Sequence, residues 1–440
     1  MTRLVPLLVA VPVFAGVVLA SGVLGLGSPA GTADQAVPVA AQAAQPSSTP
    51  VPAAAPTFVP APAATPKPAA STQRASDGGK KVVVGYYVPY DTTSWTSLQN
   101  QADSLDYVDT QWVNVDACGN VGSRDDNTLI AYARDKGVKV LPSLLTGSDW
   151  LNHRLLTNPA IADRYLSQIV SYVVEMGYPG FDLDMENIGD ADRDAYSTFV
   201  AKLADALHQR GKILTLAIPA KTTDVRTGWA GPYDYAALGK SADLILLMTD
   251  DYSWSTGPAG SIAPKDWVDK VAAYAVSQMP LEKVLVGLAF YGYDWNKTQA
   301  GTKARGLQYA QSVAIAKQHG AQITTDPTTG SATFSYTARA GEMVPNTSPP
   351  ADSKHDISVR QLGQCAVQEP AAPSPKPTPT PVPVQERTVW LEDAAAVASK
   401  LDVAVKRNVG GVGSWRLGQE DPAVWPLLAR YRSGTATPGK

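Results

Sequence analysis

The sequence feature that most constrains the fold is a regular alternation of short apolar runs with longer amphipathic stretches. The apolar runs have the length of β-strands, and the stretches between them repeat apolar residues at the period of a helix. Strands that alternate with helices form a parallel sheet that the helices cover. The expected strands are 82–88, 107–115, 138–145, 180–186, 213–219, 244–249, 284–290 and 412–417, and two of the expected helices are 160–176 and 192–209. Eight βα units predict an α/β fold of the closed (β/α)8, or TIM-barrel, type.

A long excursion, about 294–387, separates the seventh strand from the helix expected at 391–406. It contains a helix pattern (309–319), two strand-like pieces and a Pro-rich loop, 370–383. We interpret it as an insertion between strand 7 and the following helix of one barrel. The alternative is a domain boundary at the Pro-rich loop, which would leave a small C-terminal module and a sheet without its eighth strand.

The N-terminal part of the chain predicts export. Residues 1–30 hold Arg3, a long apolar run and then small residues, which is typical of a signal peptide. The run is also long enough to serve as an uncleaved membrane anchor. Residues 31–79 are rich in Pro and Ala and predict a disordered linker. The barrel is expected over 80–432, followed by a tail, 433–440.

Composition excludes several classes of function. A net charge of -3 and a pI near 5.9 give no basic excess that would attract nucleic acid or an anionic membrane surface. The 4 histidines show no metal-ligand spacing, so no zinc site is expected, and we expect no cofactor. Cys118 and Cys365 are an even count in an exported chain, which allows either one disulfide or two free thiols.

The segment 180–186, Gly-Phe-Asp-Leu-Asp-Met-Glu, carries the strongest chemical signal. Side chains alternate across a strand, so Asp182, Asp184 and Glu186 share one face and apolar residues share the other. Carboxylates held this close repel one another, and the pKa of at least one rises. The pattern indicates either acid/base chemistry or a site for a divalent metal such as Mg²⁺ or Ca²⁺.

This segment resembles the Asp-Gly-x-Asp-x-Asp-x-Glu signature of glycoside hydrolase family 18, the chitinase family. Gly180, Asp182, Asp184 and Glu186 match, while Pro179 stands where the first Asp would be. The resemblance covers about 81–428 and is similar to the bacterial branch that includes spore-cortex-lytic N-acetylglucosaminidases. It is supported by four further segments, 84–88, 247–249, 290–295 and 411–418.

The resemblance implies a substrate-assisted mechanism, in which the acetamido oxygen of the substrate is the nucleophile. Glu186 would protonate the glycosidic oxygen. Asp184 would bind the acetamido N–H and share a proton with Asp182, and Trp415 would form the apolar floor under the sugar. The other expected substrate-binding residues are Tyr87, Met248, Asp250, Tyr252, Tyr291 and Trp295.

One position departs from the family pattern. Active relatives carry Met-x-Tyr-Asp on strand 6, and that Tyr donates a hydrogen bond to the acetamido carbonyl. Here Asp250 follows Met248-Thr249 and occupies the Tyr position. Three readings stay open: Asp250 is protonated, Tyr252 substitutes for the missing Tyr, or turnover is impaired.

The sequence therefore predicts a secreted or envelope-anchored hydrolase that cleaves β-1,4 bonds of N-acetylglucosamine polymers, either chitin or peptidoglycan. We expect a monomer whose partner is the polysaccharide, with membrane attachment only if the N-terminal segment is uncleaved. The alternatives are a catalytically impaired glycan-binding protein on the same barrel, motivated by Asp250 and Pro179, and an envelope scaffold tethered through its Pro-rich segments.

Overall fold

The computed structural model describes residues 80–299, 301–348, 355–371 and 382–435. The expected signal peptide or anchor and the Pro/Ala-rich linker lie outside these residues, as does most of the expected tail. Within the described part of the chain, no helix combines the length and the apolar character that crossing a membrane requires.

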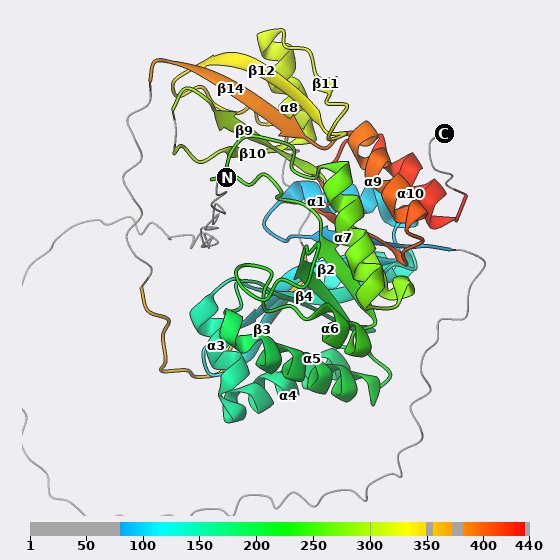
Figure 1. The fold of residues 1–440 in the computed structure, drawn as a ribbon. Coiled ribbons are helices and arrows are strands. Elements are labelled where there is room, and N and C mark those ends of the chain that lie inside the picture. The colour runs from blue at the N-terminus through cyan, green and yellow to red at the C-terminus, as the bar shows by residue number, and fades with distance from the viewer. Residues whose placement is uncertain (1–79, 300, 349–354, 372–381, 436–440) are drawn as a thin grey trace, which may run out of the picture. The chain divides into compact units, whose positions relative to one another are not determined.

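The eight expected strands form a closed parallel barrel (Figure 1). Strand β1 pairs with both β15 and β2, which closes the ring. The expected boundaries agree with the observed ones to within two residues. The barrel strands are β1 (Val82–Tyr87), β2 (Tyr107–Val115), β4 (Lys139–Thr146), β5 (Gly180–Met185), β6 (Ile213–Pro219), β7 (Leu244–Met248), β8 (Val284–Ala289) and β15 (Gly411–Trp415).

Helices connect successive barrel strands, and their apolar faces pack against the outer face of the barrel. The helix expected at 160–176 is α4 (Pro159–Glu175), which begins where the Asn158 side chain accepts a hydrogen bond from the backbone N–H of Ile161. The helix expected at 192–209 is α5. The helices around the barrel are α1 (Thr92–Gln101), α2 (Asn127–Asp135), α3 (Asp149–Thr157), α4, α5 (Arg193–His208), α6 (Tyr235–Ser241), α7 (Lys265–Gln278), α9 (Ala394–Lys406) and α10 (Val424–Arg432).

The insertion between strand β8 and helix α9 builds its own antiparallel sheet, in which β12 and β14 lie side by side (Figure 1). The strand order is β10-β9-β14-β12-β11, and helix α8 packs on this sheet. Because β15 completes the barrel after the insertion, the alternative of a separate C-terminal module is wrong. The elements are β9 (Tyr291–Asn296), β10 (Arg305–Gln308), α8 (Tyr309–His319), β11 (Thr324–Thr325), β12 (Ala332–Arg339) and β14 (Val384–Leu391).

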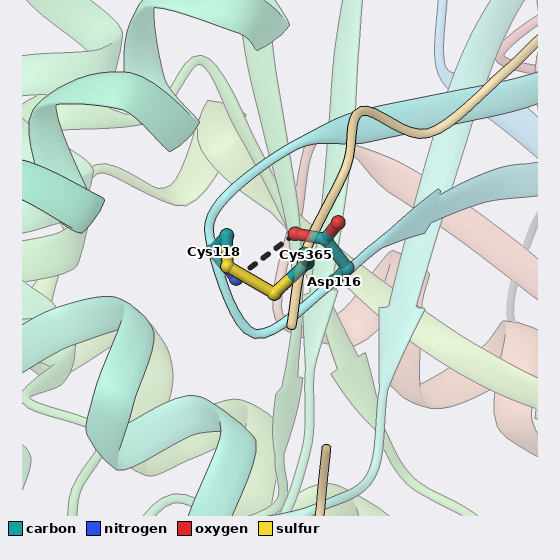
Figure 2. A group of neighbouring side chains, drawn as sticks. All are labelled: Asp116, Cys118 and Cys365. Carbon is teal, nitrogen blue, oxygen red and sulfur yellow. Dashed lines mark hydrogen bonds between the residues drawn. A yellow bond between two sulfur atoms is a disulfide. The ribbon is translucent and has the colours of Figure 1, made fainter. Parts of the chain in front are cut away.

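Part of the insertion returns to the barrel. Strand β13 (Ile357–Arg360) pairs antiparallel with β3 (Val121–Asp126), which forms a hairpin with β2. Beyond β13, Cys365 forms a disulfide with Cys118 of the β2–β3 connection, across a Cα–Cα distance of 5.7 Å (Figure 2). Asp116 accepts a hydrogen bond of 2.9 Å from the backbone N–H of Cys118 and so orders this connection. Of the two alternatives that the sequence leaves open, the structure contains the disulfide.

Candidate active site

The two faces of strand β5 have opposite chemistry, as the alternation predicts. Phe181, Leu183 and Met185 are each 0 % exposed and belong to the apolar core between the barrel and its helices. Asp182 and Asp184 therefore point to the other side of the strand, into the barrel interior, where they are 1 % and 4 % exposed. The apolar side anchors the strand, and the acidic side supplies the chemistry.

Asp182 accepts three hydrogen bonds from hydroxyl groups on three other strands. The Tyr86 hydroxyl and the Ser143 hydroxyl donate to Oδ2 over 3.0 and 2.7 Å, and the Thr215 hydroxyl donates to Oδ1 over 2.7 Å. Ser143 and Thr215 are the direct neighbours of Asp182 in the barrel register. Burial raises the pKa of Asp182 and the three hydroxyls lower it, with a net rise. The hydroxyls thus stabilise negative charge at a depth where it would otherwise be costly.

Asp184 lies one inward position further along β5. Its Oδ2 accepts a hydrogen bond of 3.2 Å from Gln111 Nε2, while its buried Oδ1 has no hydrogen-bond partner. Burial, followed by the charges of Glu186, Asp182 and Asp250, raises the pKa of Asp184 well above its ordinary value. A buried oxygen without a hydrogen-bond partner is costly, so this atom is suited to accept a hydrogen bond from a bound ligand.

Glu186 follows the last residue of β5 and is half-buried. Its backbone N–H donates to the Thr146 carbonyl over 2.7 Å, and its carbonyl accepts a hydrogen bond from the Asn152 side chain. The backbone on both sides of the Glu186 Cα atom is therefore fixed. Burial, then Asp250 and Asp251, raise the pKa of Glu186 to about 7. A carboxyl group with this pKa retains a proton near neutral pH and can give it to a substrate.

Asp250 and Asp251 follow strand β7 and meet the hydroxyl of Tyr291. The Tyr291 hydroxyl lies 3.2 Å from Asp250 Oδ2 and also bonds Asp251 Oδ1, while Tyr293 donates to Asp251 Oδ2 over 3.2 Å. Burial and Asp251 raise the pKa of Asp250 to about 7. A tyrosine hydroxyl has a single hydrogen, so it can donate to both carboxylates only in turn. Both contacts can form at once when one of the two aspartates carries a proton and donates it to the Tyr291 oxygen.

Trp415 ends strand β15 and is half-buried. Its ring centroid lies 5.7 Å from that of Tyr86, whose hydroxyl binds Asp182, and it also packs beside Tyr291. The peptide bond between Trp415 and Arg416 is cis. Met248 packs with Trp415 and Tyr86 in the cluster of the barrel interior. Trp415 and Met248, both predicted substrate-binding residues, therefore lie in the barrel interior with the carboxylates.

The contacts described for three other predicted substrate-binding residues are with residues other than the site carboxylates. Tyr87 is 4 % exposed in the core outside the barrel, so the inward tyrosine of β1 is Tyr86. Trp295 is also 4 % exposed, and its indole N–H donates to the Gly257 carbonyl over 3.1 Å. Tyr252 is 52 % exposed and its ring packs on Trp267 of helix α7, 5.1 Å between centroids. The hydroxyl that forms the hydrogen bond with Asp250 belongs to Tyr291, not to Tyr252.

Sequence reasoning missed the polar residues on the neighbouring strands. Besides Tyr86, Ser143, Thr215 and Gln111, the barrel interior holds Asp109, which is 3 % exposed. Burial and the charge of Asp182 raise the pKa of Asp109 well above its ordinary value. These residues could have been found from the sequence as polar residues at inward positions of otherwise apolar barrel strands.

The metal reading of the carboxylates finds little geometric support. Among the residues that the structure describes, the set that brings three potential ligand atoms within 4.8 Å of one another is Asp116, Cys118 and Cys365. Both sulfur atoms of that set are used in the disulfide (Figure 2).

Comparison with known proteins agrees with this geometry. The family model "Glycosyl hydrolases family 18" matches residues 82–420. The chain belongs to glycosyl hydrolase family 18. Enzymes of this family hydrolyse glycosidic bonds and act on polymers that contain N-acetylglucosamine.

Two sequence relatives come from Bacillus subtilis. The family 18 chain is 29 % identical over 285 residues to a cortical fragment-lytic enzyme, a match that covers 64 % of this chain and 56 % of the relative. It is 24 % identical over 357 residues to the uncharacterized glycosylase YvbX, covering 79 % of this chain and 90 % of that protein. The chain thus spans about half of the length of the cortical fragment-lytic enzyme.

Solved structures share the fold. A chitinase from Chromobacterium violaceum superposes with a TM-score of 0.66 at 25 % identity, covering 81 % of the family 18 chain and 99 % of the chitinase. The spore cortex-lytic enzyme SleL from Bacillus megaterium superposes with a TM-score of 0.63 at 23 % identity, covering 79 % and 73 %.

Proposed function

We propose that the protein is a secreted glycosidase that cleaves β-1,4 linkages of N-acetylglucosamine-containing polymers, chitin or peptidoglycan, with retention of configuration. The observation that carries the proposal is the position of Glu186 at the carboxyl end of β5, with a pKa raised to about 7. In barrels of this type the reacting groups lie at the carboxyl ends of the strands.

In the first step, the Glu186 carboxyl gives its proton to the glycosidic oxygen while the acetamido oxygen of the substrate attacks the anomeric carbon. The leaving sugar departs as an alcohol, and a cyclic oxazolinium ion remains. In the second step, the Glu186 carboxylate takes a proton from water, and the resulting hydroxide attacks the anomeric carbon. The carboxyl is thereby restored, and the acetamido group is released intact.

The aspartate pair would stabilise the positive charge of the oxazolinium ion. The free Oδ1 of Asp184 can accept the acetamido N–H, which orients the carbonyl oxygen for attack. The three hydroxyls on Asp182 make it the easier of the two carboxylates to ionise. A proton shared by the pair is therefore expected on Asp184 before the substrate binds, and it passes to Asp182 when Asp184 accepts the acetamido N–H.

The proposed substrates also indicate where the protein acts. The relatives include cortical fragment-lytic enzymes, and chitin and peptidoglycan both lie outside the cytoplasmic membrane. We place the protein outside the cytoplasm as a monomer, free or tethered through its N-terminal residues.

A second candidate is a glycan-binding protein without turnover, which the two aspartates at 250 and 251 motivate. An ionised Asp250 would repel the acetamido oxygen instead of donating to it. In other enzymes, the loss of one preorganised donor raises the activation free energy by about 3 to 4 kcal/mol and so slows turnover.

One comparison separates the two candidates. Hydrolysis of fluorogenic N-acetylglucosamine oligosaccharides is measured for the wild-type protein and for Glu186→Gln, with saturable binding measured on both. Turnover in the wild type that disappears in the variant supports the hydrolase. Saturable binding by both proteins with turnover by neither supports the glycan-binding protein.

A further inference from the structure

The carboxyl group of Glu186 forms no hydrogen bond or ion pair with any other residue that the structure describes. The carboxyls of Asp182 and Asp184, in contrast, are held by three hydroxyls and by Gln111 respectively. The direction in which the Glu186 side chain points therefore depends on its Cα atom and on the two peptide groups beside that atom.

Three hydrogen bonds fix these two peptide groups. The Glu186 N–H and carbonyl bind Thr146 and Asn152, on the side of strand β4 and helix α3. On the opposite side, the Tyr233 hydroxyl donates to the Met185 carbonyl over 2.6 Å. Tyr233 belongs to the connection between strand β6 and helix α6, so the backbone around Glu186 is held from both neighbouring βα units.

The Tyr233 hydroxyl takes the place of strand pairing that β5 lacks on this side. The ladder between β5 and β6 ends at the pair Leu183–Leu216, whereas the ladder between β5 and β4 continues to Met185. The Met185 carbonyl thus lies beyond the end of the β5–β6 ladder, and Tyr233 supplies its donor. Without the hydroxyl, a buried carbonyl directly before Glu186 would lose its hydrogen bond.

Tyr233 is itself held in place. It is 0 % exposed, and its ring packs edge-on against that of Tyr196 in helix α5, 5.4 Å between centroids. Its carbonyl accepts a hydrogen bond of 2.6 Å from the Lys221 ammonium, and the Arg193 guanidinium donates to the Gly231 carbonyl of the same connection over 2.6 Å. Burial raises the pKa of the Tyr233 hydroxyl well above its ordinary value, so it keeps its hydrogen.

We infer that Tyr233 is a positioning residue for catalysis: its hydroxyl fixes the peptide group between Met185 and Glu186 and thereby orients the Glu186 carboxyl toward the glycosidic oxygen. The inference rests on the proposed function, in which Glu186 is the general acid. A residue with no exposed surface does not touch the substrate, so Tyr233 acts through the backbone of Glu186. Loss of the hydroxyl should therefore slow the chemical step and leave substrate binding nearly unchanged.

The test replaces Tyr233 by Phe, which removes the hydroxyl and keeps the buried ring. Tyr165→Phe serves as the control, because Tyr165 is also 0 % exposed and its hydroxyl has no hydrogen-bond partner among the described residues. On fluorogenic N-acetylglucosamine oligosaccharides, we expect kcat of Tyr233→Phe to fall about tenfold with KM within about twofold of the wild-type value, and the control to keep both. Urea titrations establish that all three proteins are folded under the assay conditions.

Hydrogen exchange gives a second measurement that needs no turnover. The Glu186 N–H donates to Thr146 only while its peptide group keeps its orientation. Peptides that span Glu186 should therefore exchange about tenfold faster in Tyr233→Phe than in the wild type or the control.

A wild-type kcat in Tyr233→Phe, a change confined to KM, or an equal fall of kcat in the control would overturn the inference. Unchanged exchange around Glu186 would overturn it as well. Absence of wild-type turnover, or turnover that Glu186→Gln retains, would instead refute the proposed function, and the exchange experiment would then decide by itself whether Tyr233 holds this peptide group.

Discussion

The pH dependence of cleavage should reflect the charge repulsion between Glu186 and Asp250, and replacing Asp250 by Asn tests this interaction. The general acid must be protonated, so kcat/KM should fall as pH rises through the pKa of Glu186, about 7. The difference between the ordinary value of 4.5 and about 7 corresponds to about 3 kcal/mol in favour of the protonated carboxyl. Burial is the largest cause, and the charges of Asp250 and Asp251 come second and third.

Removing the Asp250 charge removes one of the causes that raise this pKa, so the pKa of Glu186 falls and the alkaline limb moves to lower pH. Asp250 itself has a pKa of about 7 and is only half ionised where the limb lies, which reduces its effect. We expect a displacement of about half a pH unit to one pH unit, that is, up to about tenfold less activity on the alkaline side of the limb.

The assay is kcat/KM between pH 4 and 9 for the wild type, Asp250→Asn and Glu282→Gln. The control removes the same formal charge from the opposite end of the barrel and should leave the limb in place. A limb that moves upward in Asp250→Asn, or that moves equally in both variants, would show that the two carboxyls do not interact as described.

Three further predictions concern the support of the site. Ser143→Ala removes one of three hydroxyl donors to Asp182, so kcat should fall about tenfold in steady-state assays, and a change confined to KM would contradict this role. Phe181→Ala opens a cavity on the fully buried outer face of β5 and should lower the free energy of unfolding by about 3 to 5 kcal/mol in urea titrations, where a loss below about 1 kcal/mol would refute tight packing there. Cys365→Ser opens a loop whose ends are 247 residues apart, and the chain-entropy estimate of its cost is about 5 kcal/mol; an unchanged urea midpoint would show that the disulfide does not constrain the unfolded chain.

The barrel was predictable because its signals are local. Each barrel strand is a short apolar run followed by a helical stretch, and β5 additionally alternates its carboxylates with apolar residues, so its inward face could be deduced. The insertion was harder. Strands β9 and β14 pair with each other from opposite ends of the insertion, so no local pattern marks them, and β10 is a short edge strand that pairs with β9. Strand β14 also runs directly up to the start of the predicted helix, which therefore includes its last residue, Leu391.

The candidate site shows the same division. The sequence reveals Asp182, Asp184 and Glu186 because all three lie in one alternating segment, 180–186, that forms β5 and the residue after it. The partners of Asp182 come from three other strands, and their contacts depend on the barrel register, which no local pattern encodes. In β1 all six residues are buried, so the sequence could not tell whether Tyr86 or Tyr87 faces inward.

The disulfide between Cys118 and Cys365 affects what happens when a protease cuts the chain. It closes a covalent ring that contains the segment from β3 to β13, and with it Asp182, Asp184, Glu186 and Asp250. A single peptide-bond cut at any point within this ring leaves the fragments joined as one molecule. A nicked protein would keep its catalytic strands tethered and would separate into two pieces only after reduction.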